Sequence, residues 1–157
     1  MAPASTIIIC TDTRSGIDEK VGLRRHVLAD TFYWIALANV RDAAHGRILG
    51  ISRGLAFRRI VTTAEVLIEY LNFYSEDPRL RMVAAQTVED ILAGTKVQVL
   101  PQSQFTFRSG LDLFRSRPDK GYSLTDCVSM ESMRALGIAD VLTDDHHFQQ
   151  EGFGLVR

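Results

Sequence analysis

Cysteines, long apolar runs and net charge are all scarce in this sequence. Its 157 residues include only two cysteines, Cys10 and Cys127, which lie far apart and outside any C-x-x-C or Cys/His cluster. This usage disfavours a disulfide framework and a zinc site and is typical of a reducing cytosol. The longest apolar run near the start covers residues 7–10, which is too short for a signal-peptide core or a membrane span. We therefore expect a cytoplasmic protein without a membrane anchor.

A net charge of −1 excludes the global positive field that marks many nucleic-acid-binding proteins. Any polyanion would have to be bound by a local basic patch or by metal ions. The composition, 46% hydrophobic and 24% charged, is that of a soluble globular protein, and the length fits one domain. Bulk charge therefore neither supports nor opposes a nucleic-acid substrate.

Residues 1–25 combine Pro, Ser, Thr, Gly and mixed charge, which is typical of a mobile or loosely packed leader. After the leader, apolar patterning predicts strands and helices in alternation. Strands are predicted at residues 26–29, 59–62, 96–100, 140–142 and 154–156. Helices are predicted at residues 31–38, 42–55, 63–74, 77–94 and 123–136, around 107–114, and as a short turn after 142. This alternation predicts one α/β domain, a three-layer sandwich in which helices flank a mostly parallel central sheet.

The helix around residues 107–114 shows helical spacing of large apolar residues. Phe107, Leu111 and Phe114 recur at intervals of three and four, so we expect them to form its inner face.

Acidic residues directly follow two of the predicted strands. Asp30 ends the first strand, and the pair Asp144 and Asp145 follows the fourth. In open α/β sheets, ligands bind beyond the carboxyl ends of the strands, where loops and helix N-termini converge. The predicted helices at 63–74 and 123–136 also carry acids near their starts, so four segments can deliver carboxylates to one place. Pattern alone does not separate Asp144 from Asp145.

The predicted helix at residues 63–74 is apolar nearly all round, which indicates burial. Its polar stripe consists of Glu65, Glu69 and Asn72. An unpaired buried carboxylate is costly, so this stripe must face water or a polar cleft. Glu65 has a second explanation, because Thr62-x-x-Glu65 fits a capping box. Glu69 lies beyond the first turn and is the stronger site candidate.

Asp126 allows two interpretations. Ser123-x-x-Asp126 fits a capping box. Asp126 also shares a helical face with Met130 and Met133, and an acid on an apolar stripe is better explained if a positive group neutralises it. Four carboxylates in one pocket would repel one another unless cations bind. Oxygen ligands without Cys or His favour Mg²⁺ or Mn²⁺.

Four stretches of the sequence resemble the motifs of PIN-domain ribonucleases, especially the VapC-like toxins of toxin–antitoxin pairs. They are VLADTFYWIAL at 27–37, TTAEVLIE at 62–69, YSLTDC at 122–127 and LTDDHHF at 142–148. The order and spacing of the four motifs match the family, and the resemblance extends to about residue 157.

The resemblance places the family's acids at Asp30, Glu69, Asp126 and Asp145. The Thr-x-Asp-x-x-Phe pattern of the fourth motif selects Asp145 over its neighbour. The sequence departs from the family at Phe32, where a hydroxyl residue is often found. The leader is also unexplained, because the family usually starts at its first strand.

The resemblance implies a PIN-like fold and a Mg²⁺- or Mn²⁺-dependent endoribonuclease that hydrolyses RNA phosphodiester bonds. It implies that Asp30, Asp126 and Asp145 hold one or two metal ions, and that Glu69 helps to place the metal or deprotonates a water. It further implies that the protein is a toxin with a cognate antitoxin, and we predict a homodimer.

Supporting roles follow for hydroxyl and basic residues. Thr31 and Thr143 could orient carboxylates or a phosphate, and equally could cap helices. Basic residues beside the acids are expected to contact RNA as a group, although each alone is also explained as solvated surface. These candidates are Arg53, Arg58, Arg59, Arg108, Arg115, Arg117 and Lys120. His146 and His147 are compatible with a metal role, but packing beside Phe148 explains them better.

Two other functions compete with the nuclease. A phosphatase with an aspartyl nucleophile would require a second acid two residues after Asp30, and position 32 is Phe. A non-catalytic PIN-like RNA-binding module is opposed by the retention of all four acids. Acids alone do not establish turnover, so RNA incubation with Mg²⁺ or a chelator is the discriminating test.

Overall fold

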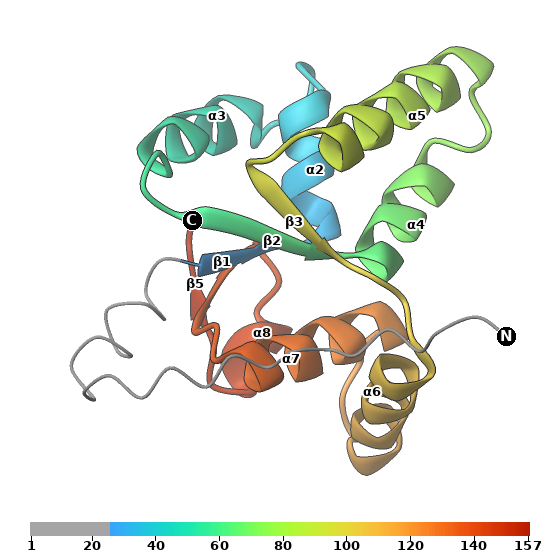
Figure 1. The fold of residues 1–157 in the computed structure, drawn as a ribbon, viewed down its shortest axis with the longest axis vertical. Coiled ribbons are helices and arrows are strands. Elements are labelled where there is room, and N and C mark those ends of the chain that lie inside the picture. Colours follow the sequence, from blue (N-terminus) through green and yellow to red (C-terminus); the bar gives the residue numbers. More distant parts are fainter. Residues whose placement is uncertain (1–25) are drawn as a thin grey trace, which may run out of the picture.

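The computed structural model describes residues 26–157, in which one five-stranded sheet lies between two layers of helices (Figure 1). The strand order is β3-β2-β1-β4-β5, and every neighbouring pair is parallel. The predicted three-layer α/β sandwich is confirmed, and its sheet is parallel throughout. The leader predicted at residues 1–25 and Cys10 lie outside the described residues, whereas Cys127 is buried.

The five strands are short and lie where the apolar runs predict them. They are β1 His26–Ala29, β2 Arg59–Thr63, β3 Val97–Leu100, β4 Asp140–Leu142 and β5 Gly154–Leu155. Side chains of the central strand alternate between the two faces. Val27 and Ala29 join one buried cluster and Leu28 joins the other. Burial of β1 on both faces is what a parallel sheet between two helical layers requires.

The helices divide between the two faces of the sheet (Figure 1). The first layer contains α2 Thr31–Ala38, α3 His45–Gly54, α4 Ala64–Phe73 and α5 Pro78–Ala93. The second contains α6 Gln104–Ser116, α7 Leu124–Leu136 and α8 His147–Gln150. Among these helices of residues 26–157, none is both long and apolar enough to cross a bilayer.

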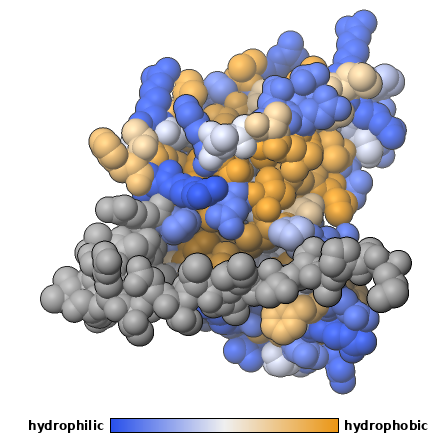
Figure 2. All heavy atoms as spheres, viewed as in Figure 1, coloured by the Kyte–Doolittle hydropathy of each residue, from blue (hydrophilic) through white to orange (hydrophobic). Residues whose placement is uncertain are grey.

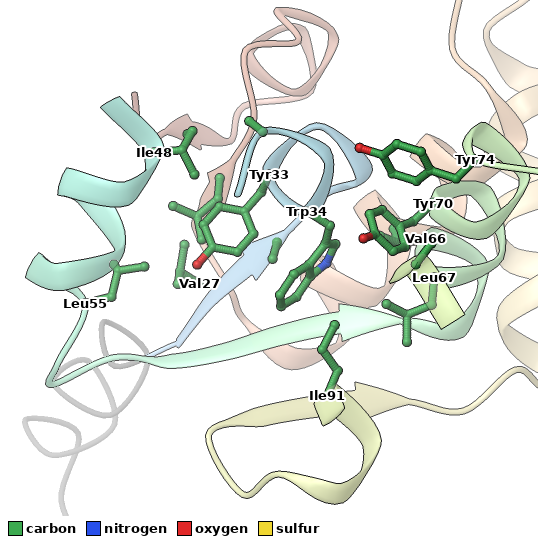
Figure 3. Close-up of a cluster of buried hydrophobic side chains, with 14 residues drawn as sticks. Val27, Tyr33, Trp34, Ile48, Leu55, Val66, Leu67, Tyr70, Tyr74 and Ile91 are labelled. Carbon is green, nitrogen blue, oxygen red and sulfur yellow. The ribbon is translucent and has the colours of Figure 1, made fainter. Parts of the chain in front are cut away.

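The core of the first layer fixes the place where β1 ends (Figure 3). The rings of Tyr33 and Trp34 in α2 pack edge to face with their centroids 4.9 Å apart. Trp34 Nε1 donates to Thr62 Oγ1 at 3.2 Å, and Thr62 Oγ1 donates to the carbonyl oxygen of Ala29 at 2.9 Å. These bonds tie α2 and the carboxyl end of β2 to the last residue of β1. The residue that follows, Asp30, is therefore held in position.

Local signals set several helix ends as predicted. Asp77 caps α5 by accepting hydrogen bonds from the backbone N–H groups of Arg79 and Leu80, and Pro78 occupies the first turn. Gly137 ends α7 in the left-handed region at φ 64°. The helix predicted from residue 42 begins at His45, because Asp42 starts a turn and its Oδ1 accepts from Ala44 N at 2.8 Å.

The predicted inner face of α6 is wrong. Phe107 and Phe114 are 43% and 46% exposed, whereas Gly110 and Leu113 are buried. The α6 backbone approaches α7 so closely at Gly110 that a Cβ atom there would lie 2.5 Å from Cγ2 of Val128. The interhelical contact is therefore made through the residue without a side chain.

Apolar side chains also gather on the surface drawn in Figure 2, over α2, α5 and β3. A groove of about 580 Å³ lies there and is lined by Trp34, Leu37, Ile91 and Val97 among others. This groove lies on the first helical layer, beside the edge strand β3.

Candidate active site

Asp30 directly follows β1 at the carboxyl edge of the sheet and is the N-cap residue of α2. Its side chain makes no capping hydrogen bond, so it is free for another role. Oδ2 accepts a hydrogen bond of 3.0 Å from Thr143 Oγ1. Oδ1 is buried and has no hydrogen-bond partner among residues 26–157. A buried carboxylate oxygen without a donor is costly, which makes this atom a candidate ligand.

The electrostatics of Asp30 show which other acids are its neighbours. The pKa of Asp30 is raised from 3.8 to about 7. Burial is the largest cause and the negative charges of Asp126 and Glu69 act in the same direction, while hydrogen bonds from Thr31 and Thr143 oppose the shift. Three acids from three separate elements therefore lie within electrostatic reach of one another.

Glu69 reaches this group from the second half of α4. The hydroxyl of Thr31, in the first turn of α2, donates a hydrogen bond to Glu69 Oε2. This contact joins two residues 38 positions apart and orients the carboxylate. The N-cap of α4 is Thr63, whose side chain accepts from Val66 N, so the capping box predicted between Thr62 and Glu65 is wrong.

Asp126 is both a cap and a member of the acidic group. Its backbone N–H donates to Ser123 Oγ at 3.0 Å, and its Oδ2 accepts from Ser123 N at 2.7 Å, which completes the capping box. Burial raises the pKa of Asp126, and the charges of Asp145 and Glu69 raise it further, against the lowering effect of the Ser123 hydrogen bonds. The cap fixes one oxygen, so the two interpretations of Asp126 are compatible.

Asp144 and Asp145 differ clearly in their surroundings. Asp145 lies close enough to Asp126 to raise its pKa, and its backbone N–H donates to Thr143 Oγ1 at 3.1 Å. Thr143 thus connects Asp30 with Asp145. Asp144 instead forms a surface ion pair of 2.5 Å with Arg47 Nη2. The structure therefore brings Asp145, and not Asp144, towards the acidic group.

The carboxylate of Asp145 is engaged with the start of α8. Its Oδ1 accepts from His147 N at 2.9 Å, and its Oδ2 lies 3.0 Å from His147 Nδ1. Ligand atoms of Asp145, His146 and His147 lie within 4.8 Å of one another and could hold an ion. The ring of His147 also packs against Tyr122 at 5.1 Å, so packing accounts for part of its position.

The residues of the acidic group fit a small divalent cation. Asp30, Glu69 and Asp126 supply only oxygen donors, which suit Mg²⁺ or Mn²⁺. Burial and the negative charges of Asp126 and Glu69 raise the pKa of Asp30, and a bound cation would favour its ionised form against both effects. Because Asp30 Oδ1 has no hydrogen-bond partner among residues 26–157, it could bind a cation without losing a hydrogen bond.

Two of the predicted RNA contacts lie far from the acids. Arg58 Nη2 donates to the carbonyl of His26 at 3.0 Å and pairs with Asp140 Oδ2 at 2.5 Å, and both partners begin strands. Arg59 is the first residue of β2. Arg58 and Arg59 therefore lie at the amino edge of the sheet, opposite Asp30, and the expectation that they flank the acids is wrong.

The other basic candidates are divided between ion pairs and open surface. Arg117 Nε pairs with Glu151 Oε1 at 2.8 Å, and Lys120 Nζ lies 3.6 Å from Asp119. The remaining three are exposed: Arg53 in the last turn of α3, Arg108 within α6, and Arg115 in the last turn of α6.

Sequence reasoning overlooked two charged residues. Arg47 carries the ion pair with Asp144 beside the fourth motif and packs over the ring of Phe32 at 5.8 Å. Glu151 is only 4% exposed at its side chain and binds both Arg117 and Arg134, which ties the end of α8 to α7. Both partnerships join distant segments, so no local pattern signals them.

Comparison with known proteins agrees with this geometry. The family model described as the PIN domain matches residues 27–153. Among solved structures, VapC20 of Mycobacterium tuberculosis, described as a toxin that cleaves the sarcin–ricin loop, is 25% identical with a TM-score of 0.75. The match covers 83% of this chain and 98% of VapC20.

FitAcB from Neisseria gonorrhoeae shares the fold at 13% identity and a TM-score of 0.62, with 83% of this chain and 96% of that one covered. No curated protein matches the sequence. The family model spans most of the chain and all four acidic positions, from Asp30 to Asp145. The chain therefore belongs to the PIN-domain family.

Proposed function

We propose that this protein is a Mg²⁺-dependent endoribonuclease whose active site consists of Asp30, Glu69, Asp126 and Asp145. One observation supports the proposal above all: Asp30 follows β1 at the carboxyl edge of the sheet, and its buried Oδ1 has no partner within residues 26–157. The charges of Asp126 and Glu69 act on the pKa of Asp30, and those of Asp145 and Glu69 act on the pKa of Asp126. Mn²⁺ could replace Mg²⁺, because both prefer oxygen ligands.

Each acid has a distinct role in this proposal. Asp30 and Asp126 hold the cation through oxygens that their hydrogen bonds with Thr143 and Ser123 leave free. Asp145 completes the acidic rim, either directly or through water. Glu69, which Thr31 orients, accepts a proton from the attacking water or helps to place the cation.

A divalent cation, when bound, supplies positive charge for the phosphate in the transition state and makes water more acidic. The side chains of the protein position the acids that would hold this cation. Thr143 holds Asp30 and the backbone of Asp145 through one hydroxyl, so the spacing of two acids depends on a single buried side chain. No covalent intermediate with the protein is required.

RNA as the substrate and toxicity as the biological role rest on family likeness. The likeness to a VapC toxin that cleaves the sarcin–ricin loop makes RNA the substrate class to test first. By the same likeness we propose a cognate antitoxin. A homodimer is a separate prediction, and a cytoplasmic location is proposed because the sparse cysteines suit a reducing compartment. Co-purification of a small partner encoded next to the gene, and a dimeric mass by light scattering, would support these proposals.

Cleavage of end-labelled RNA by the purified protein tests the enzyme directly. Wild type is expected to cut the RNA in Mg²⁺ and to stop when a chelator is added. Asp126→Asn is expected to bind RNA without cutting it. Asp112→Asn is the matched control, because Asp112 is an exposed acid on α6. RNA retention without cleavage by the wild type would contradict the proposal and favour a non-catalytic RNA-binding module.

A further inference from the structure

A cavity of about 290 Å³ lies directly beside the acidic group. Glu69 is part of its lining, so the cavity opens where the proposed reaction takes place. Residues of α4, α6 and α7 and of the segment after β3 form the rest of the wall. The volume is at the lower limit for ligand pockets, which suits one planar ring system rather than a larger ligand.

The walls of this cavity combine apolar and polar groups. Phe107 is 43% exposed and presents an aromatic surface, while Leu124 and Val128 of α7 are more buried. Asn72 and Gln102 add exposed amide groups. This combination of an aromatic surface with a few polar groups is typical of pockets that hold a nucleobase.

Glu65 is the unusual residue of the cavity wall. It lies one helical turn before Glu69 on the same face of α4. Its Oε1 is shielded from solvent without a hydrogen-bond partner among residues 26–157, and the capping role that would have explained it belongs to Thr63. A ligand that brings hydrogen-bond donors would satisfy this carboxylate.

We propose that the cavity binds a nucleobase next to the scissile phosphate and that Glu65 selects guanine. The proposal rests on the proposed ribonuclease function and specifies its sequence preference. Phe107 stacks on the base, as aromatic side chains do with unpaired bases of single-stranded RNA. Because Glu69 belongs to both the cavity wall and the acidic group, a base bound in the cavity would bring its attached phosphate close to the proposed cation site.

Guanine follows from the pattern of donors on each base. The Watson–Crick edge of guanine carries two adjacent donors, N1–H and the N2 amine, which match the two oxygens of the Glu65 carboxylate. Adenine and cytosine offer one amine beside an acceptor nitrogen. Uracil places a carbonyl oxygen on each side of its single N–H, which a carboxylate repels.

Cleavage of a randomised single-stranded RNA pool, with the cut sites read by sequencing, tests this inference. Wild type is expected to enrich guanine on one side of the cut about ten-fold over uracil. Glu65→Gln is expected to lose most of that enrichment, because the amide presents a donor to the N2 amine. Glu76→Gln, at an exposed acid outside the cavity wall, is the matched control.

Phe107→Ala provides a second test that does not depend on cleavage. In the Asp126→Asn background, it is expected to weaken binding of a guanine-containing oligonucleotide by roughly five- to 100-fold, measured by fluorescence anisotropy. Phe105→Ala is the control, since Phe105 is 75% exposed on the same helix and does not line this cavity. Thermal denaturation checks that each variant is folded.

The outcomes separate this inference from the proposed function. Cleavage by wild type with no preference for guanine, or with a preference that Glu65→Gln leaves intact, would overturn the base pocket and leave the ribonuclease standing. No cleavage by wild type, together with guanine binding that requires Glu65 and Phe107, would overturn the ribonuclease and support the pocket. Absence of both RNA cleavage and guanine binding would overturn both the ribonuclease and the base pocket.

Discussion

Replacement of Asp30 by asparagine is expected to stabilise the metal-free protein at alkaline pH while abolishing the proposed activity. Asparagine keeps the size of the side chain and an oxygen that can accept the hydrogen bond from Thr143. It removes a negative charge that burial and the neighbouring charges of Asp126 and Glu69 all destabilise. A residue that costs stability and is nevertheless present is expected to serve function.

The magnitude follows from the pKa of Asp30. The pKa is raised from 3.8 to about 7 in the folded protein, so the folded state binds more protons than the unfolded state between these values. The free energy of unfolding therefore falls as the pH rises from about 4 to about 7, and the full penalty is present above that range. At 1.36 kcal/mol per pKa unit, the shift corresponds to about 4 kcal/mol at most.

Urea denaturation in a chelator, followed by circular dichroism, measures this effect across the pH range. The free energy of unfolding of Asp30→Asn is expected to equal that of wild type near pH 4. Near pH 8 it is expected to be higher than that of wild type by up to about 4 kcal/mol. Excess Mg²⁺ is expected to stabilise wild type and not the variant, because only a binding-competent folded state gains from the ligand. Asp112→Asn, at an exposed acid, should show neither effect.

A difference in the free energy of unfolding between wild type and Asp30→Asn that stays constant at all pH values would refute this reasoning. So would a variant that is less stable than wild type near pH 8. Either result would mean that the Asp30 carboxylate is not opposed by burial and neighbouring acids in the folded protein.

Three further substitutions test other contacts. Thr143→Val keeps the side-chain shape but removes the hydroxyl bound to Asp30, and should lower the free energy of unfolding by about 1–3 kcal/mol and reduce RNA cleavage at least about ten-fold. Gly110→Ala should lower the free energy of unfolding, measured by urea denaturation, by about 1–3 kcal/mol, because its Cβ would collide with Val128. Arg58→Ala should cost about 1–2 kcal/mol by breaking its pair with the start of β4, and should leave RNA affinity in filter binding unchanged.

A matched control sharpens the Gly110→Ala test, and each of the three tests has an outcome that would contradict it. Gly50→Ala places a methyl group on an exposed helical site where no atom of residues 26–157 outside its own stretch of helix lies within 4 Å, and it should not destabilise the protein. Equal stability of Gly110→Ala and wild type would contradict the close helix contact. A large loss of RNA affinity in Arg58→Ala would return Arg58 to the RNA-binding surface, and unchanged cleavage by Thr143→Val would remove its positioning role.

Signals that act over a few residues predicted the fold well. Short apolar runs marked all five strands, and capping residues such as Asp77 and Gly137 marked helix ends, because both depend on neighbours in sequence. Asp30 and the pair of Asp144 and Asp145 stood out because the carboxyl end of a parallel strand is a topological position that alternating strands and helices reveal. Strand topology did not separate Asp145 from Asp144, and the resemblance to the family's fourth motif made that choice.

Packing between helices was harder to predict. The amphipathic pattern of α6 gives most weight to its large residues, so Phe107 and Phe114 were expected inside. The contact instead forms through Gly110, whose missing side chain lets Val128 approach. The periodicity of apolar residues does not predict a helix contact that depends on the absence of a side chain.

Ion pairs over long sequence distances were the other difficulty. Arg58 was predicted to contact RNA, yet its partner Asp140 is 82 residues away, at the start of another strand. The pair between Arg47 and Asp144 spans 97 residues. Basic residues at the surface look alike in sequence, and only their three-dimensional neighbours decide which are paired and which are free to bind phosphate.

Titration of the protein with Mn²⁺ by calorimetry near pH 7.5 tests the acidic centre most directly. Saturable binding is expected in the wild type and in Asp112→Asn, and its loss is expected in Asp30→Asn and Asp126→Asn. Equal Mn²⁺ binding by all four proteins, or none by the wild type, would show that these carboxylates do not form a cation site and would contradict the metal-dependent nuclease.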